Sequence, residues 1–368
     1  MTARAEMSSA ESVLVVVPAE TSATIVAGLP QVTRIARAAR AAGYDRVLVG
    51  DGAPQAGASR VVVVPATVVP QAAWLRALRE TPMEPETMYV DPAPVIVVQT
   101  ERASDVVAVA TRSRDAARLL SELSARFDRT KEMPPAEGRF VLGSTGDVAA
   151  AERWLLRSLV KHNEGFMSRH FERRVSLAIT RRLARTAITP NMITLASLVV
   201  GLLGAPFFLS SAPAYQLTGA LIFLAHSILD GCDGELARLK FLHSRSGAML
   251  DYWSDNAVHV AVFLCIGAGW AMTAMAAWPL LLGAVASAGA LGSAAVMFEH
   301  TATDRQLGAE SAPVTRLAAM LASRDFIYAI ILLSLFGKAA WFLGVAAVGT
   351  PGFFAMVLWN QRRHGRVR

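Results

Sequence analysis

Long apolar runs dominate the chain from about residue 190 to its C-terminus, and they restrict the possible fold more than any other feature. Six runs are candidate membrane spans, at about residues 192–211, 214–234, 247–270, 273–297, 325–337 and 339–359. A membrane-spanning helix needs about 20 mainly apolar residues, so the fifth run is short for a span. With 53% hydrophobic residues among 368, the chain is too apolar for an ordinary soluble protein of this size. We therefore predict an all-α, six-helix transmembrane domain over residues 191–368.

The basic residues give these runs an orientation. Arginine is frequent before the first run, and the tail after the sixth reads NQRRHGRVR. The turn after the second run carries Arg238, Lys240 and Arg245, and the connection after the fourth carries Arg305, Arg316 and Arg324. The connections after the first and third runs carry no charge, and the one after the fifth has only Lys338. By the positive-inside rule, both termini and the turn after the second run face the cytoplasm. The net charge of +7 therefore indicates a membrane surface rather than nucleic acid.

Residues 1–150 have the pattern of a soluble α/β domain. Runs rich in β-branched residues, typical of buried strands in a parallel sheet, occur at residues 12–19, 45–50, 60–66 and 93–99. Between the first two runs, PQVTRIARAARAAGYD is an amphipathic helix that ends at Gly43 and completes a strand–helix–strand unit. We expect a loop at residues 127–139. The first residues, MTARAEMSSAES, have no apolar segment, so we expect no signal peptide.

A strongly basic helical segment, residues 151–190, links the two parts. Its arginines recur among apolar residues: Arg169, Arg173, Arg174, Arg181, Arg182 and Arg185. A solvated linker helix would have the same composition, but this segment adjoins an apolar run, which favours a position on an anionic cytoplasmic leaflet. The two cysteines of the chain, Cys232 and Cys265, exclude a disulfide framework and a multi-cysteine metal site.

Four aspartates lie in the stretch DGCDGELARLKFLHSRSGAMLDYWSD, residues 230–255, between two of the apolar runs. Asp230 and Asp233 share one helix face, and Asp251 and Asp255 share a face of the next helix. The turn between the runs brings the two faces together at the membrane boundary, where each carboxylate costs at least about 2.5–3.5 kcal/mol. A divalent cation, or a pair of them, removes this repulsion, and carboxylate oxygens suit Mg²⁺ or Mn²⁺. Metal pairs held by aspartates are common in phosphoryl transfer.

Neighbouring residues support this hypothesis. Gly234 and Gly247 lack side chains where a ligand needs close approach to the backbone, and the guanidinium of Arg238 can bind a phosphate with two parallel hydrogen bonds. Helix capping or pairing with arginines would explain one such aspartate, but not four arranged in this way. His226 and His259, each four residues from an aspartate, can orient carboxylates or simply pack at a helix interface.

Other residues leave alternatives open. Arg305, Arg316 and Arg324 would clamp a phosphate of an acceptor, although topology alone also places arginines on a cytoplasmic connection. Cys232, between two of the aspartates, is expected to be a small packing residue. The segment FEHTATD contains Glu299, His300 and Asp304, but at no spacing that specifies a metal.

The aspartate stretch has the form D-x2-D-G-x2-A-R-x8-G-x3-D-x3-D without departure. Its eight positions are Asp230, Asp233, Gly234, Ala237, Arg238, Gly247, Asp251 and Asp255. This resembles the signature of the CDP-alcohol phosphotransferase (phosphatidyltransferase) family, and TPNMIT at residues 189–194 is also similar to that family. The resemblance covers about residues 186–360. It implies a six-helix integral membrane enzyme, often a homodimer, that uses Mg²⁺ or Mn²⁺, with two ions expected here.

The same resemblance implies the reaction and the residue roles. Such enzymes transfer a substituted phosphate from a CDP-alcohol donor to an acceptor hydroxyl and release CMP. By position, Asp230, Asp233 and Asp251 would hold the metal, and Asp255 would bind metal or act as general base. The CDP pocket would be shaped by Gly234, Ala237, Arg238 and Gly247.

A second resemblance concerns the domain order. The segment EGFMSRHFERRVSLAITRRLARTAITPN is similar to the linker of bifunctional enzymes that fuse an inositol-1-phosphate cytidylyltransferase to a di-myo-inositol-phosphate phosphate synthase. Residues 1–150 would then be nucleotidyltransferase-like, but the expected basic loop residues are absent from PAETSATIVAGLPQ. Ala66 and Thr67 stand where a metal-binding aspartate is expected, and Asp147 is displaced from the second position. We interpret this domain as a degenerate nucleotidyltransferase.

Two classes of function remain. The favoured one is a membrane CDP-alcohol phosphotransferase in phospholipid or polyol-phosphate synthesis. The alternative is a non-catalytic, metal-stabilised scaffold or transporter with a soluble binding module. The complete eight-position signature favours the enzyme.

Overall fold

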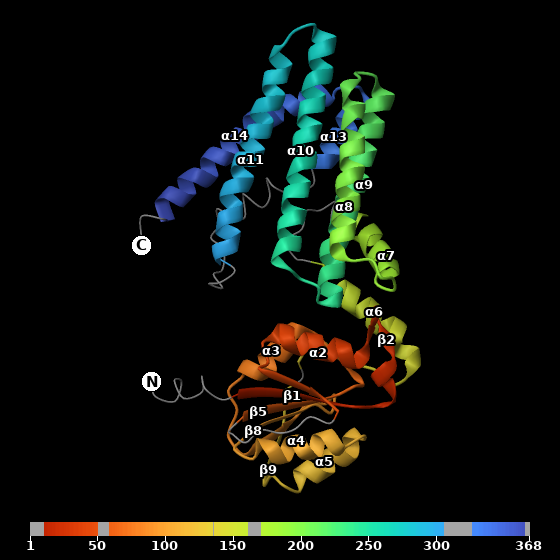
Figure 1. Cartoon of the computed structure of the whole chain (residues 1–368), viewed down its shortest axis with the longest axis vertical. Coiled ribbons are helices and arrows are strands. Elements are labelled where there is room, and N and C mark those ends of the chain that lie inside the picture. The colour runs from red at the N-terminus through yellow and green to blue at the C-terminus, as the bar shows by residue number, and fades with distance from the viewer. Residues whose placement is uncertain (1–10, 51–58, 135, 161–170, 305–325, 365–368) are drawn as a thin grey trace. The chain divides into compact units, whose positions relative to one another are not determined.

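The computed structural model describes residues 11–50, 59–134, 136–160, 171–304 and 326–364 (Figure 1). It divides into two compact units. Unit 1 comprises Met1–Ser158 with Leu239–Phe241, and unit 2 comprises Leu159–Arg238 with Leu242–Arg368. An α/β unit followed by a helical unit is the fold class that the sequence predicts, and this prediction is confirmed.

Unit 1 contains a six-stranded sheet in the order β4-β1-β5-β8-β7-β9. The strands are β1 (Glu11–Val17), β4 (Arg46–Val49), β5 (Ser59–Pro65), β7 (Thr87–Val90), β8 (Ile96–Thr100) and β9 (Arg129–Glu132). Strand β1 pairs in parallel with β4 and β5, but β8 is antiparallel to both β5 and β7. The runs predicted as strands of a parallel sheet are parallel in β1, β4 and β5, but the prediction is wrong for β8. A five-residue connection joins β7 to β8, and so short a connection permits only antiparallel pairing.

The expected loop at residues 127–139 is also wrong in part, because it contains β9. All four residues of β9 are exposed and polar, so the segment has none of the apolar pattern by which strands are found in a sequence. Its pairing with β7 fixes it as a strand. Two further pairs of short strands are antiparallel. The strands β2 (Ile25–Val26) and β3 (Leu29–Pro30) form a hairpin, whereas β6 (Val68–Pro70) pairs with β10 (Arg139–Val141), which lies far from it in the sequence.

Helices cover both faces of the sheet (Figure 1). Leu14 and Val16 of β1 pack on the side of α2 (Gln31–Ala42) and α3 (Ala72–Glu80). Val13, Val15 and Val17 pack on the side of α4 (Ala103–Arg112) and α5 (Ala116–Ser124). Burial on both faces explains the unbroken apolar runs. The predicted end of the first helix is confirmed, since Gly43 has a left-handed conformation with φ of 86°. Unit 1 also contains two short 3-10 helices, η1 (Glu20–Ala23) and η2 (Thr145–Asp147). Helix α6 (Val148–Arg157) follows η2 directly.

Unit 2 is helical. Its elements are α7 (Arg173–Leu183), α8 (Pro190–Gly204), η4 (Ala205–Leu209), α9 (Pro213–Lys240), α10 (Arg245–Ala274), α11 (Trp278–Asp304), α13 (Phe326–Leu335) and α14 (Ala339–His364). All six predicted runs are helices. Four of the described helices are long and apolar enough to cross a membrane: Pro190–Leu209, Arg245–Ala274, Trp278–Phe298 and Ala339–Trp359. Helix α13 has only 10 residues, and α9 carries the charged residues of the aspartate motif, so the count of six spans is approximate.

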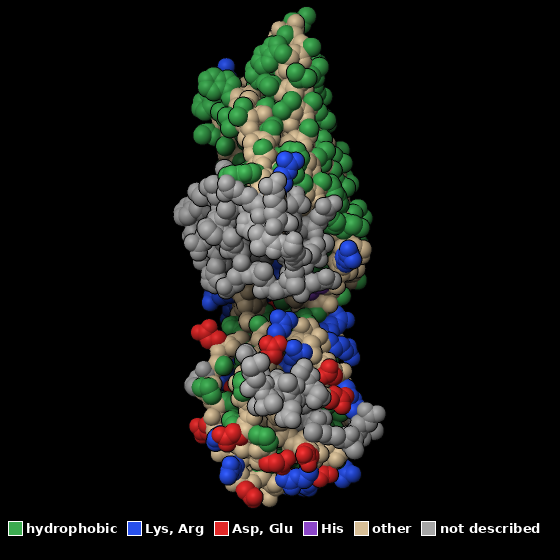
Figure 2. Space-filling model, turned by 90° about the vertical axis from the view of Figure 1, so that its left-hand side faces the viewer, with side chains coloured by type: hydrophobic (Ala, Val, Ile, Leu, Met, Phe, Trp, Pro, Cys, Tyr) green, Lys and Arg blue, Asp and Glu red, His purple; other side chains and the backbone are tan. Residues whose placement is uncertain are grey.

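The surface of each unit agrees with this division. On the face shown in Figure 2, hydrophobic side chains cover the visible helices of unit 2, whereas unit 1 carries scattered acidic and basic side chains. Exposed Leu203, Leu281 and Val345 are examples from three of the candidate spans. Apolar side chains that face outward on long helices are what a bilayer solvates, and unit 2 is accordingly a membrane domain.

Glycines allow the helices of unit 2 to approach closely, as is usual between membrane helices. A Cβ atom at Gly289 of α11 would lie 2.6 Å from the backbone nitrogen of Pro351 and 2.7 Å from the carbonyl carbon of Thr350, both in α14. Backbone atoms cannot move away as a flexible side chain would. The α11–α14 contact therefore depends on the absence of a side chain at residue 289.

We expect Gly289→Ala to lower the thermal midpoint of the purified protein, because overpacking costs about 1–3 kcal/mol. Gly344→Ala in α14 is the matched control, since a Cβ there meets no atom within 4 Å. That control should be neutral or stabilising, because alanine is the better helix former. Equal midpoints for the two variants in detergent would contradict the predicted close contact.

Candidate metal centre

Helices α9 and α10 bring three of the four predicted aspartates together. One carboxylate oxygen each from Asp230, Asp233 and Asp251 lies within 4.8 Å of the other two. Asp230 and Asp233 are only 3% and 4% exposed, and Asp251 is half-buried. Like charges so close and so far from water are unfavourable unless a cation or protons compensate them. This arrangement has the oxygen ligands and the negative charge that a divalent cation requires.

A third helix, α8, also contacts this cluster. The hydroxyl of Thr194 donates a hydrogen bond to Oδ2 of Asp233. Thr189 caps the start of α8 by accepting a bond from the Met192 amide, and Pro190 follows at the first helical position, where proline is favoured. The segment TPNMIT thus places Thr194 beside the cluster of aspartates. The sequence indicated that this segment is similar to the family, but it did not predict that Thr194 contacts Asp233.

Asp255 has different surroundings from the other three aspartates. Its Oδ1 lies 3.4 Å from Nε2 of His226 and 3.9 Å from Nε2 of His259, and its side chain is 30% exposed. His226 is buried, and its Nδ1 lies 2.9 Å from the carbonyl oxygen of Ser197, which can only accept. That bond directs Nε2 toward Asp255. The expected proximity of His259 to Asp255 is thus observed, whereas His226, which the spacing placed on the face of Asp230, lies beside Asp255 of the next helix.

The remaining motif residues occupy α9 and the first turn of α10. Gly247 lies where a Cβ would be 2.8 Å from Oδ1 of Asn191 and 2.8 Å from Oγ of Ser244. Ser244 caps α10 by accepting a bond of 2.9 Å from the Gly247 amide. The bare Cα of Gly247 therefore allows the start of α10 to approach the start of α8. A Cβ at Gly234 would meet a nitrogen of Arg238 at 3.4 Å, an ordinary contact.

Several predicted residues lie apart from this cluster or outside the description. Arg305, Arg316 and Arg324 fall in residues 305–325, outside the described parts of the chain. Ala237 and Arg238 are half-buried, three and four residues beyond Gly234 on the same face of α9. Cys232 is fully buried, with its thiol 3.3 Å from the carbonyl oxygen of Ile228, as expected for a packing residue.

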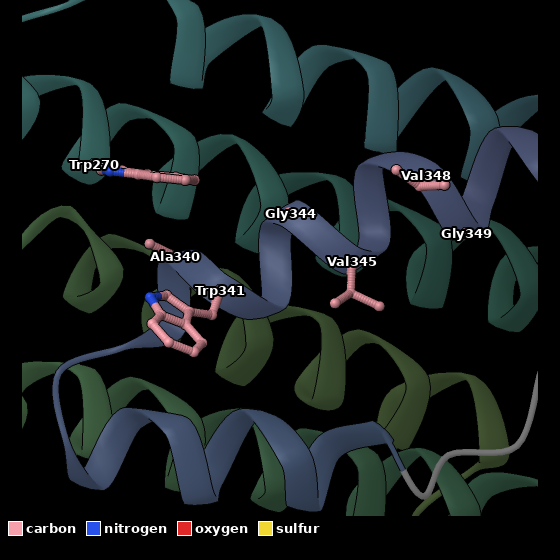
Figure 3. A pocket seen from close by; sticks show the side chains of 7 residues that line it. All are labelled: Trp270, Ala340, Trp341, Gly344, Val345, Val348 and Gly349. Atoms are coloured by element: carbon pink, nitrogen blue, oxygen red, sulfur yellow. The ribbon is translucent and has the colours of Figure 1, made fainter.

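A hollow of about 620 Å³ lies elsewhere in unit 2 (Figure 3). Trp270 of α10 lines it together with six residues of α14, among them Trp341 and Val345. None of the lining side chains has a carboxylate, an imidazole or another titratable group, so the hollow offers no side-chain ligand for a divalent cation and no general base. The three aspartates, rather than this hollow, are the candidate reaction site.

The residues of unit 1 that stand near the expected catalytic positions have local hydrogen-bond partners. Ala66 and Thr67 follow β5, and the carbonyl oxygen of Ala66 accepts a bond from the hydroxyl of Thr21 in η1. Asp147 accepts bonds from the amides of Gly143 and Ser144 at 2.9 and 2.8 Å. Its carboxylate thus holds the turn before α6.

Residues 187–355 match the family model described as CDP-alcohol phosphatidyltransferase. The chain contains a CDP-alcohol phosphatidyltransferase domain. This domain extends from the residues just before α8 into α14, and it includes all eight signature positions and the three clustered aspartates. The family resemblance predicted from the signature is confirmed.

Two curated relatives are similar to part of the chain. The chain is 36% identical over 143 residues to the Rubrobacter xylanophilus protein named "Bifunctional IPC transferase and DIPP synthase". The matched region is 38% of this chain and 32% of that protein. The Thermococcus kodakarensis protein of the same name is 39% identical over 113 residues, or 30% of this chain and 25% of the relative. The matches thus span about a third or less of the length of these relatives.

Solved structures of a Mycobacterium tuberculosis phosphatidylinositol phosphate synthase also match weakly. The form with CDP-DAG bound is 21% identical and covers 50% of this chain and 94% of that one, with a TM-score of 0.36. The complex with manganese and citrate is 22% identical and covers 50% and 88%, with a TM-score of 0.35.

Proposed function

We propose that this protein is an integral membrane CDP-alcohol phosphotransferase that moves a substituted phosphate from a CDP-alcohol to an acceptor hydroxyl and releases CMP. The observation that carries the proposal is the convergence of Asp230, Asp233 and Asp251 within the CDP-alcohol phosphatidyltransferase domain. The complete signature and the names of the curated relatives support phospholipid or polyol-phosphate synthesis as its setting. No observation favours the scaffold or transporter alternative.

The three clustered aspartates fit Mg²⁺ or Mn²⁺, because both ions prefer hard carboxylate oxygens. We assign Asp230, Asp233 and Asp251 as ligands of divalent cations, and we propose that two such ions bind. When bound, the metal neutralises phosphate oxygens and stabilises the leaving phosphate. Thr194 positions the Asp233 carboxylate toward this role through its hydroxyl.

The transfer requires one proton to leave the acceptor. The acceptor hydroxyl oxygen forms a bond to the β-phosphorus of the donor while the bond from that phosphorus to the CMP oxygen breaks, and CMP departs with the electron pair. We assign Asp255 as the base that takes the hydroxyl proton, since its carboxylate lies beside His226 and His259 and the three aspartates that converge are the other ones. Gly234, Ala237, Arg238 and Gly247 are proposed to line the CDP pocket, with Arg238 binding a phosphate.

The remaining partners follow from the charge pattern and the family. We propose that unit 1, the aspartates and the C-terminus face the cytoplasm of a cytoplasmic membrane, because basic residues flank these segments. The basic α7 segment is proposed to lie near the anionic leaflet. A homodimer, and a phosphate of the acceptor bound by Arg305, Arg316 and Arg324, remain part of the proposal.

The test is a screen of CDP-alcohols, including CDP-diacylglycerol and CDP-inositol, with polyol and polyol-phosphate acceptors. Purified protein in detergent should release CMP from at least one pair in the presence of Mn²⁺ or Mg²⁺, and mass measurement should identify the joined product. Chelation of the metal should stop the release. If wild-type protein released no CMP from any pair, the proposed transferase would have to be abandoned.

Unit 1 is proposed to be a nucleotidyltransferase-like domain that has lost its own reaction. Ala66 and Thr67 offer no carboxylate after β5, and Asp147 is engaged by two backbone amides. We expect the full chain to release no pyrophosphate from CTP with an alcohol phosphate. Pyrophosphate release that depends on both substrates would show that this unit keeps an active site.

A further inference from the structure

Glu235 lies inside the aspartate motif, but it points away from the metal cluster. Residues of an α-helix are spaced about 100° apart, so Glu235 is about 200° from Asp233 and about 140° from Asp230 around α9. Its side chain is 0% exposed. A fully buried carboxylate that faces neither the cluster nor solvent needs other partners.

Helix α7 supplies those partners. Oε1 of Glu235 accepts bonds from Nη1 of Arg173 at 2.7 Å and from Oγ of Ser176 at 2.6 Å. Oε2 accepts a bond from the hydroxyl of Thr180 at 2.7 Å. All three donors lie on one face of α7, because they are spaced by three and four residues. The motif helix is thus tied to α7 by one carboxylate and three donors.

A glycine of the motif helix also leaves space for a side chain of α7. A Cβ at Gly231 would lie 3.3 Å from Nη1 of Arg173, so the glycine leaves room for the guanidinium to reach Glu235. The thiol of Cys232 lies 3.5 Å from the carbonyl oxygen of Ser176. The face of α9 opposite the aspartates is therefore shaped to receive α7 along a full turn.

Stability alone does not explain a buried ion pair at this place. Apolar residues of similar volume are often equally or more stabilising than a buried ion pair, whereas charged pairs fix a particular orientation. An orientation is what the metal cluster requires, since rotation of α9 would carry Asp230 and Asp233 away from Asp251. We propose that Glu235 is a positioning residue that, through Arg173, Ser176 and Thr180, uses α7 to fix the rotation of α9 and hold the aspartates in place for metal binding. This inference rests on the proposed metal-dependent function.

The experiment measures Mn²⁺ binding to the full-length protein in detergent, by the electron paramagnetic resonance signal of free Mn²⁺, together with the thermal midpoint. Glu235→Gln keeps the side-chain shape but removes the charge that Arg173 binds. We expect it to weaken Mn²⁺ binding about tenfold, the lower end of what loss of an outer partner costs a metal site. Turnover should fall in parallel.

Gln216→Ala is the matched control. Gln216 is a buried polar residue at the opposite end of α9, where it accepts a bond from the Ala339 amide. This variant should lower the thermal midpoint while Mn²⁺ affinity stays at the wild-type value. If Glu235→Gln behaves in the same way, with a lower midpoint and unchanged Mn²⁺ affinity, then α7 only packs and the inference is wrong.

A gentler variant covers the case in which Glu235→Gln does not fold. Thr180→Val removes one donor and retains the Arg173–Glu235 pair. It should weaken Mn²⁺ binding relative to the wild type, by less than about tenfold, and unchanged affinity in a folded Thr180→Val protein would overturn the inference. A wild-type protein that binds no Mn²⁺ would overturn the proposed function as well, which distinguishes the two failures.

Discussion

Asp233→Asn is expected to abolish CMP release while leaving a folded membrane protein. The substitution removes a negative ligand from the cluster of three aspartates and alters the oxygen that Thr194 contacts. Loss of an outer partner of a metal site already costs about 10–100-fold, so loss of a ligand should exceed about 100-fold. The same change relieves repulsion in the metal-free protein, so the thermal midpoint without metal should be unchanged or higher.

The measurement pairs CMP release with the thermal midpoint at several Mn²⁺ concentrations. Wild-type protein should gain stability as Mn²⁺ is added, because a ligand that binds only the folded state stabilises it. Asp233→Asn should lose that gain. Asp115→Asn is the control, since Asp115 caps α5 in unit 1 through a bond that asparagine also accepts. Full activity of purified Asp233→Asn would refute the assignment of this residue as a ligand.

Asp255→Asn should reduce turnover by about 10²–10⁴-fold, the usual contribution of a general base, while donor binding survives. The structure supports this separation, because Asp255 contacts two imidazoles and the other three aspartates converge on one another. Asp230→Asn should instead weaken metal and donor binding together. The two variants therefore differ in kind as well as in size.

Calorimetry of donor binding beside single-turnover rates separates these effects. For Asp255→Asn, the donor affinity should match the wild type, and the rate of the chemical step should fall. For Asp230→Asn, the affinity itself should fall. If Asp255→Asn loses donor and metal binding as severely as Asp230→Asn, then Asp255 is chiefly a ligand and another group must take the proton.

The sequence was sufficient to predict that Asp230, Asp233 and Asp251 converge, but it did not distinguish Asp255 from them or describe what surrounds the cluster. Spacings of three and four residues placed Asp230 with Asp233 and Asp251 with Asp255, because these are distances along a single helix. The roles of Thr194 and Glu235 cannot be predicted from the sequence, because their partners are distant in the chain. Thr194 is 39 residues from Asp233, and Glu235 is 62 residues from Arg173. A hydroxyl or a carboxylate in a helical segment has no pattern that names its partner in another helix.

The errors in unit 1 have a similar origin. Strand β8 was found by its apolar run, but the direction of a strand depends on its connection to β7, which was not recognised. Strand β9 was missed because its four residues are all exposed. The lengths of α9 and α13 likewise depend on where polar residues and turns interrupt the apolar runs. The periodicity of apolar residues in the sequence indicates which residues are buried. It does not show how strands pair or where helices end.

The double coverage of the sheet in unit 1 has a consequence for how this part of the chain can evolve. Because both faces of β1 and β5 are buried, nearly every change within these strands alters the core. The segments that follow them, at residues 18–23 and 66–67, combine exposed and buried residues: Glu20 and Ala23 are exposed, whereas Ala66 is fully buried and accepts a bond from the hydroxyl of Thr21. Substitutions at Glu20 or Ala23 leave the core unchanged, but a larger side chain at Ala66 would disturb it. The strands are therefore constrained by packing even where exposed loop residues are free to change. If unit 1 has lost a reaction, as proposed above, this packing explains why its fold persists.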